Sequence, residues 1–168
     1  DILFNSKMDK KPTVPTPDLK SNSFFALKVR LLLVEICEAR NLIGEGKNGD
    51  NYAQLALHRP GETQPRVNLK TEIKTDSHPK WFTRWSLALE EDITEMRIQI
   101  WDWDRITSDD LVGELTINLQ DLVDKGPIGS KNEGWYELPS ASGSKKIVGE
   151  LRIILEVVTL NGLREAKA

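Results

Sequence analysis

Aspartates are concentrated in one short stretch, residues 101–114, directly after an apolar segment of strand length. The stretch is Trp-Asp-Trp-Asp-Arg-Ile-Thr-Ser-Asp-Asp-Leu-Val-Gly-Glu. Carboxylates packed this densely repel one another and resist burial unless a cation neutralises them. Ca²⁺ accepts about six to eight oxygen ligands in an adaptable geometry, so it suits such a group best. The stretch is therefore predicted to be a calcium-binding loop.

The spacing of the carboxylates in this loop has a geometric reason. Asp102 and Asp104 are two residues apart on extended backbone, so their side chains project to one side, while Trp103 points away and its carbonyl can turn inward. The residues after Asp104 form an arch that returns Asp110 to the same space. Three carboxylates are thus expected to share one cavity.

Other chemistries for the loop are weaker. A solvated acidic turn stays open as an alternative, because aspartate is favoured in turns by its bonds to local backbone. A helix–loop–helix calcium site needs glycine at the sixth position and glutamate at the twelfth, but counting from Asp102 these are Thr107 and Gly113. The Asp-x-Asp pair of metal-dependent sugar transferases requires an α/β nucleotide-binding domain, for which the chain has neither length nor pattern.

The rest of the chain limits what the loop can be attached to. Its 168 residues, 39% hydrophobic and 29% charged, are typical of one globular domain with tails. No apolar run approaches the roughly 20 residues that cross a bilayer, and a net charge of −3 argues against nucleic-acid binding. The chain starts at Asp1 without a signal pattern, which indicates a piece of a longer protein. The single cysteine, Cys37, lies in an apolar strand run and is expected to be buried.

Strand-length segments with alternating apolar residues fill the middle of the chain. Residues 1–23 are predicted to be a tail or linker, 24–159 a β-sandwich and 160–168 a second tail. Only residues 118–123 place apolar side chains on one helical face, so the pattern predicts an all-β antiparallel sandwich of about eight strands. The strand candidates are 27–34, 52–57, 69–75, 84–89, 96–101, 114–119, 134–138 and 149–158.

Four separated blocks of sequence carry a family resemblance. They are Ala-Arg-Asn-Leu … Gly-Asp-Asn-Tyr (39–52), Lys-Thr-Glu-Ile-Lys-Thr-Asp-Ser-His-Pro-Lys-Trp (70–81), Ile-Trp-Asp-Trp-Asp-Arg … Asp-Leu-Val-Gly-Glu (100–114) and Trp-Tyr-Glu-Leu (135–138). In this order they resemble a C2 domain, the lipid-binding sandwich named from protein kinase C. The resemblance covers about residues 26–158 and implies an eight-stranded antiparallel Greek-key β-sandwich of type II topology. In such domains three loops at one end hold Ca²⁺.

The resemblance also implies which residues act. Asp102 and Asp104 match the aspartates that open the third loop, Asp110 the one that closes it, and Asp50 the aspartate of the first loop. The first loop is shorter than the family's, so Glu45 is the candidate replacement for a missing aspartate. Further oxygens are expected from Trp103, Thr107 and Ser108, and membrane contacts from Arg105, Ile106 and Lys47.

A binding module rather than an enzyme is expected, because neither His58 nor His78 has the context of a nucleophilic triad. The resemblance implies a monomeric signalling module that Ca²⁺ recruits, as a peripheral membrane protein, to anionic phospholipid on the cytoplasmic face of a membrane. The alternative is a calcium-independent C2-like module that binds a protein partner or a phosphoinositide through its strands, as the targeting part of a larger enzyme. The candidate phosphoinositide patch consists of Arg59, Arg66, Lys70 and Lys74.

Overall fold

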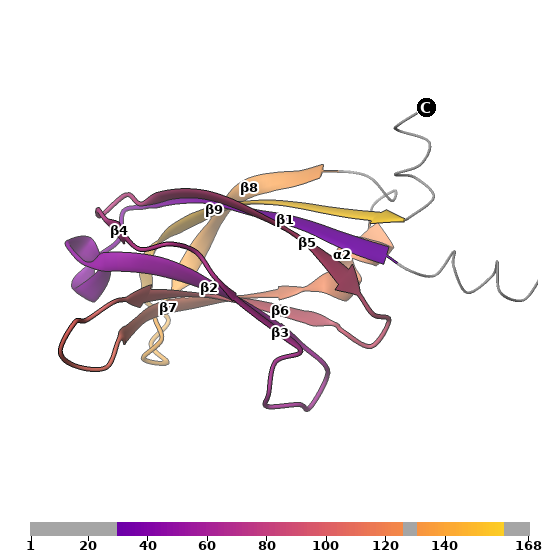
Figure 1. Ribbon diagram of the computed structural model, residues 1–168, viewed down its shortest axis with the longest axis horizontal. Coiled ribbons are helices and arrows are strands. Elements are labelled where there is room, and N and C mark those ends of the chain that lie inside the picture. The colour runs from indigo at the N-terminus through magenta and orange to yellow at the C-terminus, as the bar shows by residue number, and fades with distance from the viewer. Residues whose placement is uncertain (1–29, 126–130, 160–168) are drawn as a thin grey trace, which may run out of the picture.

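The computed structural model describes residues 30–125 and 131–159, which form two facing antiparallel sheets (Figure 1). The predicted tails, 1–23 and 160–168, lie outside the described residues, as do residues 24–29. The strands are β1 (Arg30–Arg40), β2 (Asp50–His58), β3 (Val67–Lys70), β4 (Lys74–Thr75), β5 (Lys80–Leu89), β6 (Glu95–Asp102), β7 (Asp110–Asn118), β8 (Lys131–Pro139) and β9 (Ile147–Thr159). A 3₁₀ turn, η1 (Gly44–Lys47), and a short helix, α2 (Leu119–Lys125), complete them.

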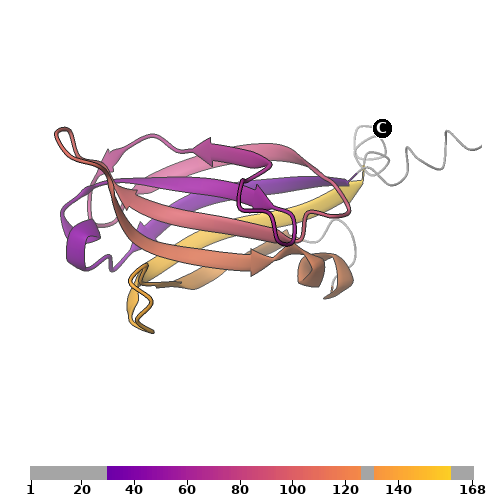
Figure 2. The ribbon, with the colours of Figure 1, turned by 90° about the horizontal axis from the view of Figure 1, so that it is seen from below.

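One sheet has the strand order β5-β1-β9-β8, and the other has the order β3-β2-β6-β7 with β4 beside β2. Figure 2 shows the second sheet lying across the first. The core forms because apolar residues alternate along the strands: in β6, Met96, Ile98 and Ile100 are fully buried, while Arg97 and Gln99 between them are not. The predicted all-β antiparallel sandwich is therefore confirmed. The assignment to type II topology stays a prediction.

The described residues contain nine strands rather than eight, because the segment predicted as one strand, 69–75, is divided into β3 and β4. At the division, Thr71 donates its backbone N–H to the Ala53 carbonyl at 2.9 Å, while its side-chain oxygen accepts the Ala53 N–H at 2.9 Å. A side chain thus replaces a backbone group in the ladder, which interrupts regular pairing. No helix in the described part of the chain is both long and apolar enough to span a membrane.

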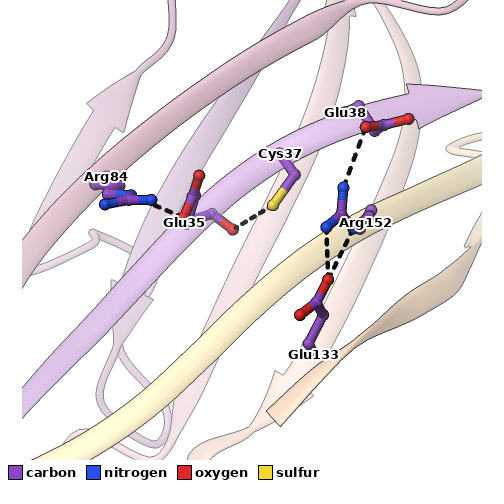
Figure 3. A network of polar contacts seen from close by, with 6 residues as sticks. All are labelled: Glu35, Cys37, Glu38, Arg84, Glu133 and Arg152. Carbon is purple, nitrogen blue, oxygen red and sulfur yellow. Dashed lines mark hydrogen bonds and ion pairs between the residues drawn. The ribbon is translucent and has the colours of Figure 1, made fainter. Parts of the chain in front are cut away.

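A bulge interrupts β1 at Cys37, where its pairing with both β5 and β9 changes register between Ile36 and Glu38. Cys37 is 1% exposed, which confirms the expected burial, and burial and then the Glu35 charge raise the pKa of its thiol to about 11. Figure 3 shows carboxylates on both sides of it paired with arginines, Glu35 with Arg84, and Glu38 and Glu133 with Arg152. These contacts tie β5, β1, β9 and β8 together.

Four connections meet at one end of the sandwich, on the left in Figure 1. They are loop 1 (residues 41–49), loop 2 (76–79), loop 3 (103–109) and the β8–β9 turn (140–146). Strand register places them together, because Arg40 lies opposite Glu150, Asp102 opposite Asp110, and Pro139 opposite Ile147. We call this the loop-bearing end; the opposite end carries the other connections and α2.

Candidate functional site

Asp50, Asp102 and Asp110 lie at neighbouring strand ends in the second sheet. Asn51 of β2 is opposite Asp102 of β6, and Asp102 is opposite Asp110 of β7. The Asp50 N–H donates to Asp102 Oδ1 at 2.9 Å, and the Trp103 N–H donates to the Asp50 carbonyl at 2.9 Å. Loops 1 and 3 are therefore joined at the point where the predicted carboxylates meet.

The charge around Asp102 is one-sided. Burial raises the pKa of the Asp102 carboxyl, and the negative charges of Asp50, Glu45 and Asp110 raise it further, against the opposing hydrogen bond from the Asp50 N–H. Loop 1 lies very close, since a Cβ on Gly49 would be only 2.4 Å from Asp102 Oδ1. The structure thus brings Glu45 and Asp50 of the first loop region to Asp102 and Asp110, as predicted.

Asp104 is directed differently. Its Oδ1 accepts the Ile106 N–H at 2.8 Å and the Thr107 N–H at 3.2 Å, and its Oδ2 accepts the Thr107 hydroxyl at 2.7 Å. These bonds lower the pKa of Asp104. Asp104 and Thr107 therefore shape loop 3 from within, and in residues 30–125 and 131–159 no three or more Asp, Glu, His or Cys side chains form a ready-made metal site. The Ser108 carbonyl lies 3.5 Å from the Thr107 hydroxyl, and Trp103 is 39% exposed.

Asp109 was absent from the predicted site, yet it anchors loop 3 to the sheet. The Tyr52 hydroxyl donates to Asp109 Oδ2 at 2.6 Å, and the Asp104 N–H donates to Asp109 Oδ1 at 3.2 Å. The Tyr52 bond is the main reason that the pKa of Asp109 is lowered. The signal was the Asp109–Asp110 pair, because adjacent residues at a strand start face opposite sides, so only one of them can join the shared cavity.

Tyr52→Phe should loosen loop 3 without changing the core. The ring stays in place, but Asp109 loses the donor that holds the loop against β2. Hydrogen exchange should be faster at the Ile106 and Thr107 amides in the variant, while amides in β6 exchange as in the wild type. Unchanged exchange in loop 3 would show that this anchor is dispensable.

Asn51 holds two of the loops together. It is fully buried, and its Nδ2 donates to the carbonyls of Gly46 (2.9 Å), Gly49 (3.2 Å) and Asp76 (3.1 Å). Its Oδ1 has no hydrogen-bond partner within the described chain. The signal in the sequence was a polar residue on the inward side of an apolar strand, since Ala53 and Leu55 follow it on the same face.

The candidate phosphoinositide residues are mostly engaged with carboxylates. Arg59 pairs with Glu90 and Asp92, Arg66 with Glu62 at 3.0 Å, and Lys74 with Glu72 at 3.4 Å. Lys70 lies 5.2 Å from the centre of the Tyr52 ring. Arg59 and Arg66 flank the β2–β3 connection at the opposite end, so the four residues do not form one cluster of free cations.

Comparison with known proteins gives consistent matches. The Ras GTPase-activating protein 4 of Mus musculus is 29% identical over 118 residues, which cover 69% of this chain and 14% of that protein. The protein kinase C eye isozyme of Drosophila melanogaster is 31% identical over 121 residues, covering 70% of this chain and 16% of that protein. The chain therefore spans less than a fifth of either relative.

Solved structures share the fold. The first C2 domain of a plant extended synaptotagmin 1 superposes with a TM-score of 0.62 at 16% identity, over 77% of this chain and 95% of that one. The family model described as C2 domain matches residues 30–138, which is most of the described sandwich. This match over more than half of its length shows that the chain belongs to the C2 domain family.

Proposed function

We propose that this domain is a peripheral membrane-binding module that Ca²⁺ recruits to anionic phospholipid. The observation that carries the proposal is the distribution of exposed apolar side chains. Large exposed hydrophobic residues in the described chain all lie at or beside the loop-bearing end: Ile43, Ile73, Phe82, Trp103, Ile106 and Ile147. A polar aqueous surface gives no reason for such grouping, whereas a lipid surface does.

Ile106 and Phe82 are the most exposed members of this group. Ile106 at the tip of loop 3 is 91% exposed. Phe82 is 51% exposed and has a left-handed backbone with φ of 44°, which is uncommon for a bulky residue. Strain of this kind often accompanies function. Burying one such side chain in lipid contributes about 1.5–3 kcal/mol, so several together are needed for firm attachment.

The donor set at the loop-bearing end fits Ca²⁺. The carboxylates around Asp102 are hard oxygen donors whose like charges raise its pKa, so a divalent cation would relieve the repulsion. Asp50, Asp102 and Asp110, with Glu45, would hold the ion. The bound ion would supply positive charge that allows acidic loops to approach anionic lipid. Lys47 and Arg105 would meet lipid phosphates beside them.

The proposal extends to the parent protein. The domain acts as the non-catalytic, monomeric targeting part of a longer signalling protein at the cytoplasmic face of a membrane. Its support is that the matched relatives, a kinase and a GTPase-activating protein by name, contain it as a small share of their length. The calcium-independent alternative has less support, because three of its four cations are paired.

Co-sedimentation with vesicles tests the proposal. The wild type should sediment with phosphatidylserine vesicles in the presence of Ca²⁺ and much less in chelator. Ile106→Ser should weaken binding about 10- to 100-fold, corresponding to the lost burial, while calorimetry records unchanged Ca²⁺ binding. If Ca²⁺ neither binds nor promotes sedimentation of the wild type, the proposal is wrong.

A further inference from the structure

The β8–β9 turn belongs to the loop-bearing end, although no predicted site residue lies in it. The Ser140 N–H donates to the Lys146 carbonyl at 2.8 Å, which closes the turn, and Gly143 provides the positive φ of 73° that it needs. Directly after it, the Val148 carbonyl accepts the Ile43 N–H at 3.0 Å, which ties the start of β9 to loop 1. A bridge between Gly113 and Ser140 ties the other side to β7. The turn is therefore held beside the acidic loops.

The two lysines of this turn are cations that the fold does not use. Lys145 and Lys146 are exposed, and neither forms an ion pair with any described carboxylate. Most arginines in the described chain are paired, among them Arg40, Arg59, Arg66, Arg84, Arg97 and Arg152. No acidic residue occurs between Glu137 and Glu150, so positive charge in the turn has no local compensation.

An apolar residue adjoins this charge. Ile147 is 38% exposed and follows Lys146 directly. The serines of the turn, Ser140, Ser142 and Ser144, bond to one another through their hydroxyl oxygens at 2.9 and 3.2 Å, which adds a neutral polar surface. Two free ammonium groups next to an exposed aliphatic side chain match an anionic lipid surface, with phosphate outside and hydrocarbon beneath.

We infer that the β8–β9 turn, through Lys145, Lys146 and Ile147, is a second lipid-contact site that binds anionic phospholipid without Ca²⁺. The inference rests on the proposed membrane binding and adds a contact that is present before Ca²⁺ arrives. In chelator the acidic loops repel an anionic surface, while the turn attracts it. The turn would then hold the domain weakly at the membrane, and Ca²⁺ binding would strengthen the attachment.

The double variant Lys145→Gln/Lys146→Gln tests the inference in the full chain. In chelator, the wild type should bind phosphatidylserine vesicles weakly and phosphatidylcholine vesicles not at all. The variant should bind phosphatidylserine about 10- to 30-fold more weakly, since each lysine near an anionic surface contributes roughly a fivefold change in affinity. Its affinity should also depend less steeply on salt, and Ca²⁺ binding by calorimetry should equal that of the wild type.

Arg30→Gln/Lys131→Gln is the matched control. It removes the same charge from the first residues of β1 and β8, at the opposite end of the same sheet, and should bind vesicles in chelator like the wild type. Equal weakening in both double variants would overturn the inference, because net charge alone would then explain the binding. Wild-type binding that needs Ca²⁺ and is unchanged in the lysine variant would overturn the inference alone. No wild-type binding with or without Ca²⁺ would overturn the proposed function as well.

Discussion

Asp102→Asn is expected to raise the melting temperature of the calcium-free domain and to abolish the further rise that Ca²⁺ gives the wild type. Asn keeps the oxygen that accepts the Asp50 N–H, but it removes the charge that burial and three neighbouring carboxylates disfavour. The increase in chelator should be a few degrees, because about 1 kcal/mol shifts the melting temperature of domains of this size by roughly 2–8 °C. Thermal unfolding in chelator and in saturating Ca²⁺ measures both effects.

Asp109→Asn is the control for this prediction. It makes the same chemical change in the same loop, yet the pKa of Asp109 is lowered, chiefly by the Tyr52 hydroxyl. A lowered pKa means that the ionised form favours the folded state, so at neutral pH this variant should melt at a lower temperature. The two variants should therefore change the melting temperature in chelator in opposite directions. A decrease for Asp102→Asn would contradict the crowding of carboxylates, and a retained Ca²⁺ response would contradict the site.

Asn51→Asp is expected to lower the free energy of unfolding by about 3 kcal/mol or more. The buried amide donates to three carbonyls, and a carboxylate would place a negative charge against the same oxygens, close to Asp102. Both loop 1 and loop 2 lose their common tether, so Ca²⁺ binding should weaken with stability. Urea unfolding monitored by tryptophan fluorescence measures the loss.

Asn118→Asp makes the same change at an exposed position. Asn118 uses its Oδ1 as an acceptor for the Gln120 N–H at 2.9 Å and the Asp121 N–H at 3.4 Å at the start of α2. Aspartate keeps this acceptor and suits a helix start, so stability should change by less than about 0.5 kcal/mol. Equal losses at positions 51 and 118 would mean that the Asn51 tether contributes nothing specific.

The alternation of apolar residues was sufficient to predict the layers of the fold, because a sheet with one buried face imposes it directly. It was insufficient where a side chain enters the backbone ladder. Thr71 divides the segment 69–75 by bonding to Ala53, a residue distant in sequence. Strand ends were also predicted too short: β7 begins at Asp110 rather than at Glu114, since pairing with β6 continues through polar residues that carry no periodic signal.

The candidate site was predictable to the extent that ligand position follows strand position. Asp50, Asp102 and Asp110 lie at strand ends and meet through the register of β2, β6 and β7. The side chain of Asp104 depends instead on donors within loop 3, and its bonds to Ile106 and Thr107 arise only when the loop closes. The β8–β9 turn carries no spacing signal, because its importance comes from where the topology places two ordinary lysines.

The bulged centre of the first sheet has a practical consequence for observing this domain. Cys37 is the chain's one thiol, it is buried, and its raised pKa keeps it protonated at neutral pH. Its strand pairs on both sides, so a thiol reagent gains access only when the sheet separates. The rate of labelling therefore reports how often the domain opens, and the domain carries this reporter at its centre without any engineered label.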